Sequence, residues 1–420
     1  MMQYDVTAVR SQFPALVRTH GQSTLAFLDN PAGTQVPQLV VNRMTAALIG
    51  ANANLGGFFP TSIDAEALVQ AAHDAAATFV NARHPSEVFF GQNMTTLTFA
   101  MSRSIGATWT AGDEIILSRM DHDANISPWL LLAEDRGLVV RWLEFSPDTF
   151  EFNLDDLRRL MTSRTKLIAV CYASNITGTI NDVRAIASIA HAAGALVYVD
   201  AVQYAPHGLI DVQAINCDFL VCSAYKFFGP HFGLFWGRQE LLQSMRAYKV
   251  RPAAEELPWR FTTGTSSRES LAGVHAAIDY IASLSRYERR CAADATLRDR
   301  LAAGFLVMKA HDDKLTLRLI EGLRSMNRVR VLGISDPAAI DRRVSTVSFF
   351  VEDGHSDDIA RSMAASGLQV WSGDNYGVEP YRQLSLFDHG CGVRVGPVHY
   401  NTTEEVDRVI SGLETWLRAN

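Results

Sequence analysis

The fold is decided by the stretch Cys217-Asp218-Phe219-Leu220-Val221-Cys222-Ser223-Ala224-Tyr225-Lys226-Phe227-Phe228-Gly229-Pro230. Its apolar first half predicts a buried strand, and the Gly-Pro pair predicts a turn. Lys226 lies between aromatic residues, where an ammonium group loses its hydration at a large cost. Burial lowers the pKa of a lysine, so the neutral amine can attack a carbonyl carbon. The alternative is that Lys226 buries only its stem and extends the amine to water or to an acid.

A second apolar stretch, Ala195-Leu196-Val197-Tyr198-Val199-Asp200, also ends in a charged residue. Asp200 precedes Lys226 by 26 residues (226 − 200), which leaves room for a short helix or loop and one strand. We expect the two side chains at the carboxyl ends of neighbouring strands, where open α/β sheets hold their sites. A lysine that forms a Schiff base, with a carboxylate that keeps a pyridine nitrogen protonated, is the minimum that pyridoxal 5′-phosphate (PLP) needs. The pair therefore predicts a PLP site.

The wider pattern indicates an α/β protein with two parts. Strands alternate with helices from about residue 90 to 236, which is typical of a mostly parallel sheet with helices on both faces. Shorter elements follow, among them a strand over 367–372, and a helix over 6–16 begins the chain. We predict an N-terminal segment over 1–25 that packs on a small domain, a large PLP-binding domain over 26–270, and a linker helix with a small α+β domain over 271–420.

Composition excludes several classes of protein. The 420 residues are 48% hydrophobic and 20% charged, which is ordinary for a globular chain with a sizeable core. A net charge of −7 favours neither nucleic acid nor acidic membranes as partners. No signal peptide and no run of membrane-spanning length is found. The five cysteines are scattered and form no C-x-x-C pair, so we expect no disulfide framework, no metal site and a cytoplasmic location.

Two further stretches carry candidate site residues. Asn93, Met94 and Thr95 follow a predicted strand and begin a helix, whose free N–H groups and positive dipole end suit a phosphate. The alternative is a simple helix cap by Asn93 or Thr95. His122 follows the strand predicted over 113–117. It is either a loop histidine with ordinary partners or a ring that stacks on a planar cofactor and moves protons.

In their order along the chain, these motifs are similar to those of the class V aminotransferase and cysteine desulfurase family of fold-type I PLP enzymes. The likeness spans nearly the whole chain. The matching motifs are Leu28-Asp29-Asn30-Pro31-Ala32, Gln92-Asn93-Met94-Thr95, Asp121-His122-Asp123-Ala124-Asn125, Ser174-Asn175 with Gly178, Asp200-Ala201-Val202-Gln203, Ser223 with Lys226, Gly264-Thr265, and Val393-Arg394 before Tyr400-Asn401-Thr402.

The resemblance implies a role for each of these positions. Lys226 would bind PLP covalently and move the proton of the substrate α-carbon, Asp200 would pair with the ring nitrogen, and His122 would stack on the ring. Arg394 would bind the substrate carboxylate with two parallel hydrogen bonds. The other implied cofactor contacts are Asn93, Met94, Thr95, Ser223 and Tyr225 around the phosphate, Asn175 and Gln203 near the 3′ oxygen, and Thr265 across the interface of a homodimer. The implied substrate contacts also include Ala32, Gly33 and Asn54.

The chain departs from the family where desulfurases carry their sulfur-accepting cysteine. Tyr376 occupies that position, and a phenol cannot accept a persulfide; Trp371 replaces the loop arginine. Cys391 is the nearest cysteine in sequence and is predicted to lie in a turn. The sequence therefore predicts an aminotransferase or C–S lyase that acts on an amino acid, with Tyr376 or His122 as a second acid or base. The alternatives are an isopenicillin-N-epimerase-like epimerase and a non-catalytic protein that uses the PLP fold for binding or regulation.

Overall fold

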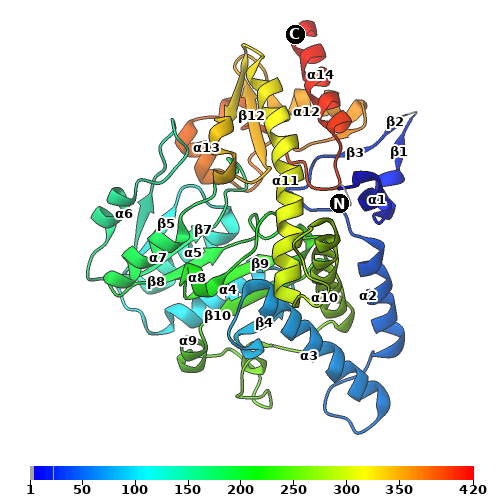
Figure 1. Cartoon of the computed structure of the whole chain (residues 1–420). Coiled ribbons are helices and arrows are strands. Elements are labelled where there is room, and N and C mark those ends of the chain that lie inside the picture. The colour runs from blue at the N-terminus through cyan, green and yellow to red at the C-terminus, as the bar shows by residue number, and fades with distance from the viewer. Residues whose placement is uncertain (1–3, 22) are drawn as a thin grey trace.

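The computed structural model describes residues 4–21 and 23–420. Its centre is a seven-stranded sheet in the order β4-β10-β9-β8-β7-β5-β6 (Figure 1). The strands are β4 (Val88–Gly91), β5 (Glu114–Ser118), β6 (Val139–Leu143), β7 (Thr165–Cys171), β8 (Leu196–Asp200), β9 (Phe219–Ser223) and β10 (Gly233–Gly237). Within this sheet only β10 runs against its neighbours, so the mostly parallel α/β sheet predicted from the sequence is confirmed.

Helices cover both faces of this sheet, and alternate residues of each strand point to opposite faces. Ile116 packs with the helices of one face, whereas Ile115 and Leu117 pack with those of the other. The first face carries α3 (Pro60–Val80), α6 (Leu154–Leu160), α7 (Val183–Ala192), α8 (Val212–Ile215) and α10 (Arg268–Ser283). The second carries α4 (Met94–Ile105), α5 (Ser127–Arg136) and α9 (Gln239–Ser244). Burial on both sides explains the continuous apolar runs of these strands.

The C-terminal part is built around a three-stranded antiparallel sheet in the order β11-β12-β14. These strands span Val329–Leu332, Val347–Val351 and Val393–Val395. Around them lie α11 (Leu297–Arg324), α12 (Ser356–Ala365), α13 (Val378–Leu384) and α14 (Thr403–Ala419). The long helix α11 runs from this part to the large sheet, as Figure 1 shows.

The start of the chain packs on the C-terminal part. β3 (Ala26–Phe27) pairs in parallel with β13 (Leu368–Gln369), and the Arg10 side chain binds Glu405 at 2.9 Å. The single helix predicted over 6–16 is wrong, because Pro14 lacks an amide donor. Helix α1 spans only Val6–Arg10, and a 3₁₀ turn follows at Pro14–Val17. The strand predicted over 367–372 is reduced to the two residues of β13. The proposed domain boundaries stay a prediction.

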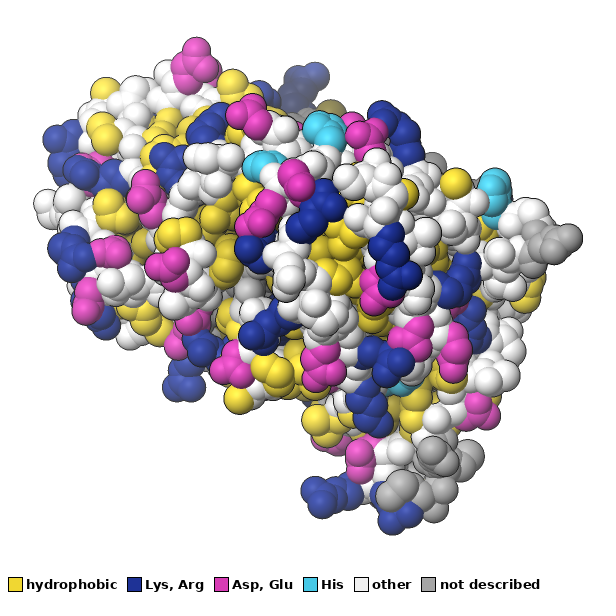
Figure 2. Space-filling model, turned by 90° about the horizontal axis from the view of Figure 1, so that it is seen from above, with side chains coloured by type: hydrophobic (Ala, Val, Ile, Leu, Met, Phe, Trp, Pro, Cys, Tyr) yellow, Lys and Arg dark blue, Asp and Glu magenta, His cyan; other side chains and the backbone are white. Residues whose placement is uncertain are grey.

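The remaining α-helix and strands of the described chain are α2 (Gln38–Gly50), β1 (Thr19–His20) and β2 (Ser23–Thr24). In the described ranges, no helix combines the length and the apolar character that crossing a membrane requires. On the face drawn in Figure 2, acidic and basic side chains are interspersed and neither sign forms a continuous field. That face therefore offers no surface suited to a polyanion.

Candidate active site

Lys226 lies just beyond the carboxyl end of β9, on a 3₁₀ turn over Ala224–Lys226. Its side chain is buried, and its amine donates a hydrogen bond to the carbonyl oxygen of Pro31. Burial, with a smaller contribution from the positive charge of Arg394, lowers the pKa of Lys226 from 10.5 to about 7, and the carboxylate of Asp200 opposes this change. The amine is therefore available in its neutral, nucleophilic form near neutral pH.

Asp200 is the last residue of the neighbouring parallel strand, and it lines the same cavity as Lys226. Its Oδ1 accepts a hydrogen bond from the Val202 amide at 2.8 Å. Burial raises the pKa of Asp200 from 3.8 to about 6, while the Val202 amide and the charge of Lys226 lower it. A protonated ring nitrogen next to Asp200 would stabilise the ionised carboxylate. The structure thus brings together the two side chains on which the sequence interpretation depends.

His122 follows β5 and lines the same cavity. Its Nδ1 accepts a hydrogen bond from the Ala124 amide at 3.0 Å, which assigns the ring proton to Nε2. Burial, together with the nearby charges of Lys226 and Arg394, lowers the pKa of His122 from 6.5 to about 3. The ring is therefore neutral near pH 7, with a flat face suited to stacking.

The N-terminus of α4 forms another wall, through Met94 and Thr95. Asn93 caps this helix, since its Oδ1 accepts a hydrogen bond from the Thr96 amide at 2.8 Å. Ser223 accepts a hydrogen bond from the Met94 amide at 3.0 Å. Asn93 and Ser223 thus hold the helix end in place, and the positive end of its dipole suits an anion.

Three buried polar atoms in the walls of this cavity and of the cavity beside it lack a hydrogen-bond partner among residues 4–21 and 23–420. They are Oδ1 of Asn175, Oε1 of Gln203 and Nε of Arg394. Gln203 donates through Nε2 to the Thr346 hydroxyl at 2.6 Å, and Asn175 donates through Nδ2 to the Asn375 carbonyl at 3.0 Å. Because buried polar atoms are nearly always paired in proteins, these three fit a polar ligand. A cofactor with a phosphate, a ring nitrogen and a phenolic oxygen matches the residues present.

Arg394 comes from β14 and faces an adjoining cavity of about 740 Å³, which Lys226 also lines. Its Nη1 donates to the Asn175 carbonyl at 3.1 Å, which leaves part of its donor fork free for a carboxylate. Burial lowers the pKa of Arg394 to about 10, so it stays charged near pH 7. Ala32 lines this cavity too, whereas Gly33 packs against Tyr225, whose ring carbon would lie 3.2 Å from an added Cβ.

Tyr376 covers the outer side of this cavity, on the loop between β13 and α13. Its ring stacks on His122 with 5.4 Å between the ring centroids, although 70% of the residue is exposed. Tyr376 and Asn375 have positive φ angles of 57° and 49°, and for a residue such as Tyr376 this conformation costs about 1–2 kcal/mol. The Asp123 amide donates to the Tyr376 carbonyl at 2.7 Å and helps to hold this backbone.

Besides Asn93, Ser223 and Gly33, which support the walls, three further predicted residues line neither cavity. Asn54 and Thr265 are exposed on the surface of the single chain. Cys391 is buried in a small apolar cluster with Tyr381 and Leu386, and burial raises the pKa of its thiol to about 11. This position disfavours Cys391 as a nucleophile.

Two acids near the site, Asp121 and Asp29, were not predicted as site residues from the sequence. Asp121 accepts hydrogen bonds from the Asn125 side chain at 2.6 Å and the Cys171 amide at 3.0 Å, and burial raises its pKa to about 7. Asp29 is near Arg394, and burial raises its pKa to about 6. Both lie in motifs that carry the family resemblance, which was the available signal.

Comparison with known proteins agrees with this geometry. Residues 26–409 match the aminotransferase class-V family. A cysteine desulfurase of Serratia proteamaculans is 30% identical over 98% of each chain, and a probable cysteine desulfurase of Synechocystis sp. is 31% identical over 98% of this chain and 95% of its own. The apo structure of a cysteine desulfurase from Thermococcus onnurineus NA1 superposes with a TM-score of 0.87 over the whole of both chains, at 25% identity. The cysteine desulfurase CsdA from Escherichia coli gives a TM-score of 0.82 at 23% identity, over 99% of each chain.

The fold and the matches define a fold-type I enzyme of the PLP-dependent class. The chain belongs to the class V aminotransferase family, within its cysteine desulfurase-like part. The family predicted from the motifs is confirmed.

Proposed function

We propose that the protein binds PLP and acts at the α-carbon of an amino acid, as an aminotransferase or a C–S lyase. The observation that carries this proposal is the cavity shared by Lys226 and Asp200, with Arg394 on the wall of the adjoining cavity. These side chains supply an amine, a carboxylate and a carboxylate-binding cation. A non-catalytic binding protein would have no need of all three.

Each residue then has a defined task. PLP, when bound, supplies an electron sink for the pair of electrons left at the α-carbon. Asp200 holds the ring nitrogen, and the N-terminus of α4 binds the phosphate. Arg394 orients the substrate through its carboxylate, and the Lys226 amine takes and returns the α-proton. His122 packs on one side of the site, where Tyr376 covers it and excludes water.

The cysteines support a reaction without a persulfide. Among the described residues that line the two cavities, the sole cysteine is Cys171. Its thiol is buried, and burial raises its pKa well above 9.0, so it is not ionised at neutral pH. Tyr376 stands on the loop that covers the site, and a phenol cannot accept sulfur. Sulfur would therefore leave as free sulfide.

An epimerase is the second candidate, because Lys226 and Tyr376 both line the adjoining cavity. An epimerase strictly needs an acid or base on each face of the substrate, whereas the other two reactions do not. The exposed position of Tyr376 on a loop favours the aminotransferase or lyase.

The proposal is tested by incubating the PLP-loaded protein with single amino acids, each with and without a second keto acid as amino acceptor, and analysing the products by mass. We expect a keto acid from transfer or elimination, and none from the Lys226→Ala variant. With cysteine as substrate we expect free sulfide and no protein-bound persulfide, and Cys391→Ser should behave as the parent. Persulfide on Cys391 would contradict the argument from Tyr376. A product of inverted configuration without keto acid would establish the epimerase instead.

We propose further that the protein is a homodimer. Large apolar side chains are exposed on α2, on the loop after it and at the start of α3, among them Leu48, Ile49, Phe58, Phe59 and Ile63. Such a patch typically marks an interface, and a second copy of the chain would bring Asn54 and Thr265 to a neighbouring site. Light scattering should give twice the mass of 46.3 kDa. Ile49→Glu with Phe58→Glu should halve the mass, whereas the control Val17→Glu, also on an exposed apolar residue, should not.

The domain division at about residues 25 and 270 and the cytoplasmic location remain part of this proposal. The pairing of β3 with β13 supports an N-terminal segment that packs on the small domain.

A further inference from the structure

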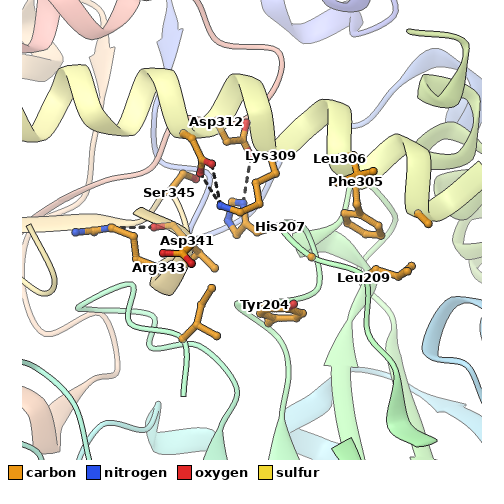
Figure 3. Close-up of a pocket in the computed structure, with 15 residues that line it drawn as sticks. Tyr204, His207, Leu209, Phe305, Leu306, Lys309, Asp312, Asp341, Arg343 and Ser345 are labelled. Carbon is orange, nitrogen blue, oxygen red and sulfur yellow. Dashed lines mark hydrogen bonds and ion pairs between the residues drawn. The ribbon is translucent and has the colours of Figure 1, made fainter. Parts of the chain in front are cut away.

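A further cavity, of about 370 Å³ and separate from the two at the candidate active site, lies between α11 and the loop that follows β8 (Figure 3). Within the described chain, no residue lines both this cavity and the candidate active site. Its size is in the range of pockets that hold small organic molecules. It is therefore a separate feature of the molecule.

One end of this cavity is apolar. Leu209, Phe305 and Leu306 lie together there, away from the charged residues, as Figure 3 shows. Tyr204 forms the adjacent wall, and its ring stacks on Tyr172 with 3.7 Å between the centroids and 10° between the planes. Such a wall is held in place by packing and suits a flat hydrocarbon group.

The other end contains a buried carboxylate with a free oxygen. Asp312 is 4% exposed, and its Oδ1 has no hydrogen-bond partner among residues 4–21 and 23–420. Its Oδ2 lies 3.4 Å from Nδ1 of His207. Burial raises the pKa of Asp312, and a cation bound at Oδ1 would offset that change. Burial of an unpaired carboxylate oxygen costs free energy, which suggests that a ligand supplies a hydrogen-bond donor to Oδ1.

The cations of this cavity already have partners. Lys309 binds both carboxylate oxygens of Asp313, at 2.8 and 2.9 Å. Arg343 donates to the carbonyl oxygens of Val344, Ile334 and Thr346. The group without a partner is therefore Oδ1 of Asp312, which is a hydrogen-bond acceptor. The carboxylate of Asp341 also lines this end of the cavity. Charge and hydrogen bonding together disfavour an anion here.

We propose that this cavity binds an organic cation with an apolar, aromatic body, whose ammonium N–H donates to Oδ1 of Asp312. The aromatic body lies against Tyr204, Phe305 and Leu306. The proposal is independent of the reaction at Lys226, because the two sites share no residue.

The probe for the test is N,N-dimethyl-2-phenylethylamine. As a tertiary amine it cannot condense with an aldehyde, so binding is not confused with reaction at the cofactor. Isothermal titration calorimetry of the full chain, with and without PLP, should give one site per chain and the same affinity in both forms. Two further probes keep the aromatic body and change the head group: 2-phenylethanol is neutral and phenylacetate is an anion. The hydroxyl of 2-phenylethanol can still donate to Asp312 but carries no positive charge, so we expect this alcohol to bind about tenfold more weakly. We expect phenylacetate not to bind.

Two variants and a control identify the site. Asp312→Asn removes the negative charge and should weaken the binding of the tertiary amine at least about tenfold. Ala302→Phe fills the apolar end without changing the charge and should abolish binding of both the amine and the alcohol. Glu321 lies on the exposed side of the same helix, so the control variant Glu321→Gln should bind the amine as tightly as the parent protein does. A thermal unfolding scan confirms that each variant is folded.

Three results would overturn the proposal. The amine and the alcohol could bind with equal affinity, which would remove the role of the charge. Asp312→Asn could bind the amine as tightly as Glu321→Gln. The parent chain could bind none of the probes.

Discussion

Lys226 should lose its proton near pH 7 in the cofactor-free protein. Burial lowers the pKa of this amine from 10.5 to about 7, a change of about 3.5 units. At about 1.4 kcal/mol per unit, the neutral form is favoured by about 5 kcal/mol relative to a lysine in water. At pH 7 about half of the Lys226 amines are then neutral, against about one in 3,000 for an unperturbed lysine.

The assay is trace acetylation of the cofactor-free protein at a series of pH values, with the rate for each lysine-containing peptide followed by mass spectrometry. The rate for Lys226 should reach half of its maximum near pH 7. Lys314 is exposed and serves as the internal control for the reactivity of the reagent. The comparison uses midpoints, so the slower access of the reagent to a buried amine does not affect it.

Two variants test whether each neighbouring charge raises or lowers the pKa of Lys226. Arg394→Gln removes a positive charge that lowers the pKa of Lys226, so its midpoint should rise. Asp200→Asn removes a negative charge that raises this pKa, so the midpoint should fall. If the midpoint for Lys226 lies near 10.5, the ordinary pKa of a lysine, the reasoning from burial is refuted.

Three other substitutions have defined outcomes. Arg394→Lys should raise KM for an amino acid about tenfold or more, with kcat less affected, because a lysine cannot make two parallel bonds to a carboxylate; an unchanged KM in steady-state kinetics would contradict this role. Tyr376→Phe should leave kcat unchanged, because the ring covers the site and its hydroxyl moves no proton; a fall in kcat of about a hundredfold would contradict this role. Glu114→Gln tests the ion pair between Glu114 and Arg141, in which Arg141 lowers the pKa of Glu114 from 4.5 to about 2. The ion pair therefore stabilises the fold above pH 4.5, and this stabilisation is lost as the pH falls from 4.5 to 2. In denaturant unfolding the variant should be about 2 kcal/mol less stable at pH 7, and the difference should vanish near pH 2.

The sequence could predict the sheet and the pair at its centre because both depend on local patterns. The strands of Asp200 and Lys226 are buried on both faces and read as apolar runs. In a parallel sheet the ends of such strands meet at one edge, so the residues that follow them share a site. This argument needs no knowledge of distant contacts.

Other parts of the site depend on contacts between distant segments. Asp29 lies near Arg394 because residue 29 bridges to Gly396, a contact across more than 360 residues. The ring of Tyr376 reaches His122 because its loop adopts positive φ angles, which no local pattern of Asn375 and Tyr376 announced. Similarly, no local pattern indicated that Oδ1 of Asp312 would lack a hydrogen-bond partner in the cavity beside α11.

The central claim is that the Lys226 amine holds PLP in the cavity that Asp200 lines. The most direct test is to reduce the PLP-loaded protein with borohydride, digest it and find the modified lysine by mass spectrometry. We predict one phosphopyridoxyl group, on the peptide that contains Lys226. An unmodified Lys226, with the label absent or on another lysine, would contradict the claim.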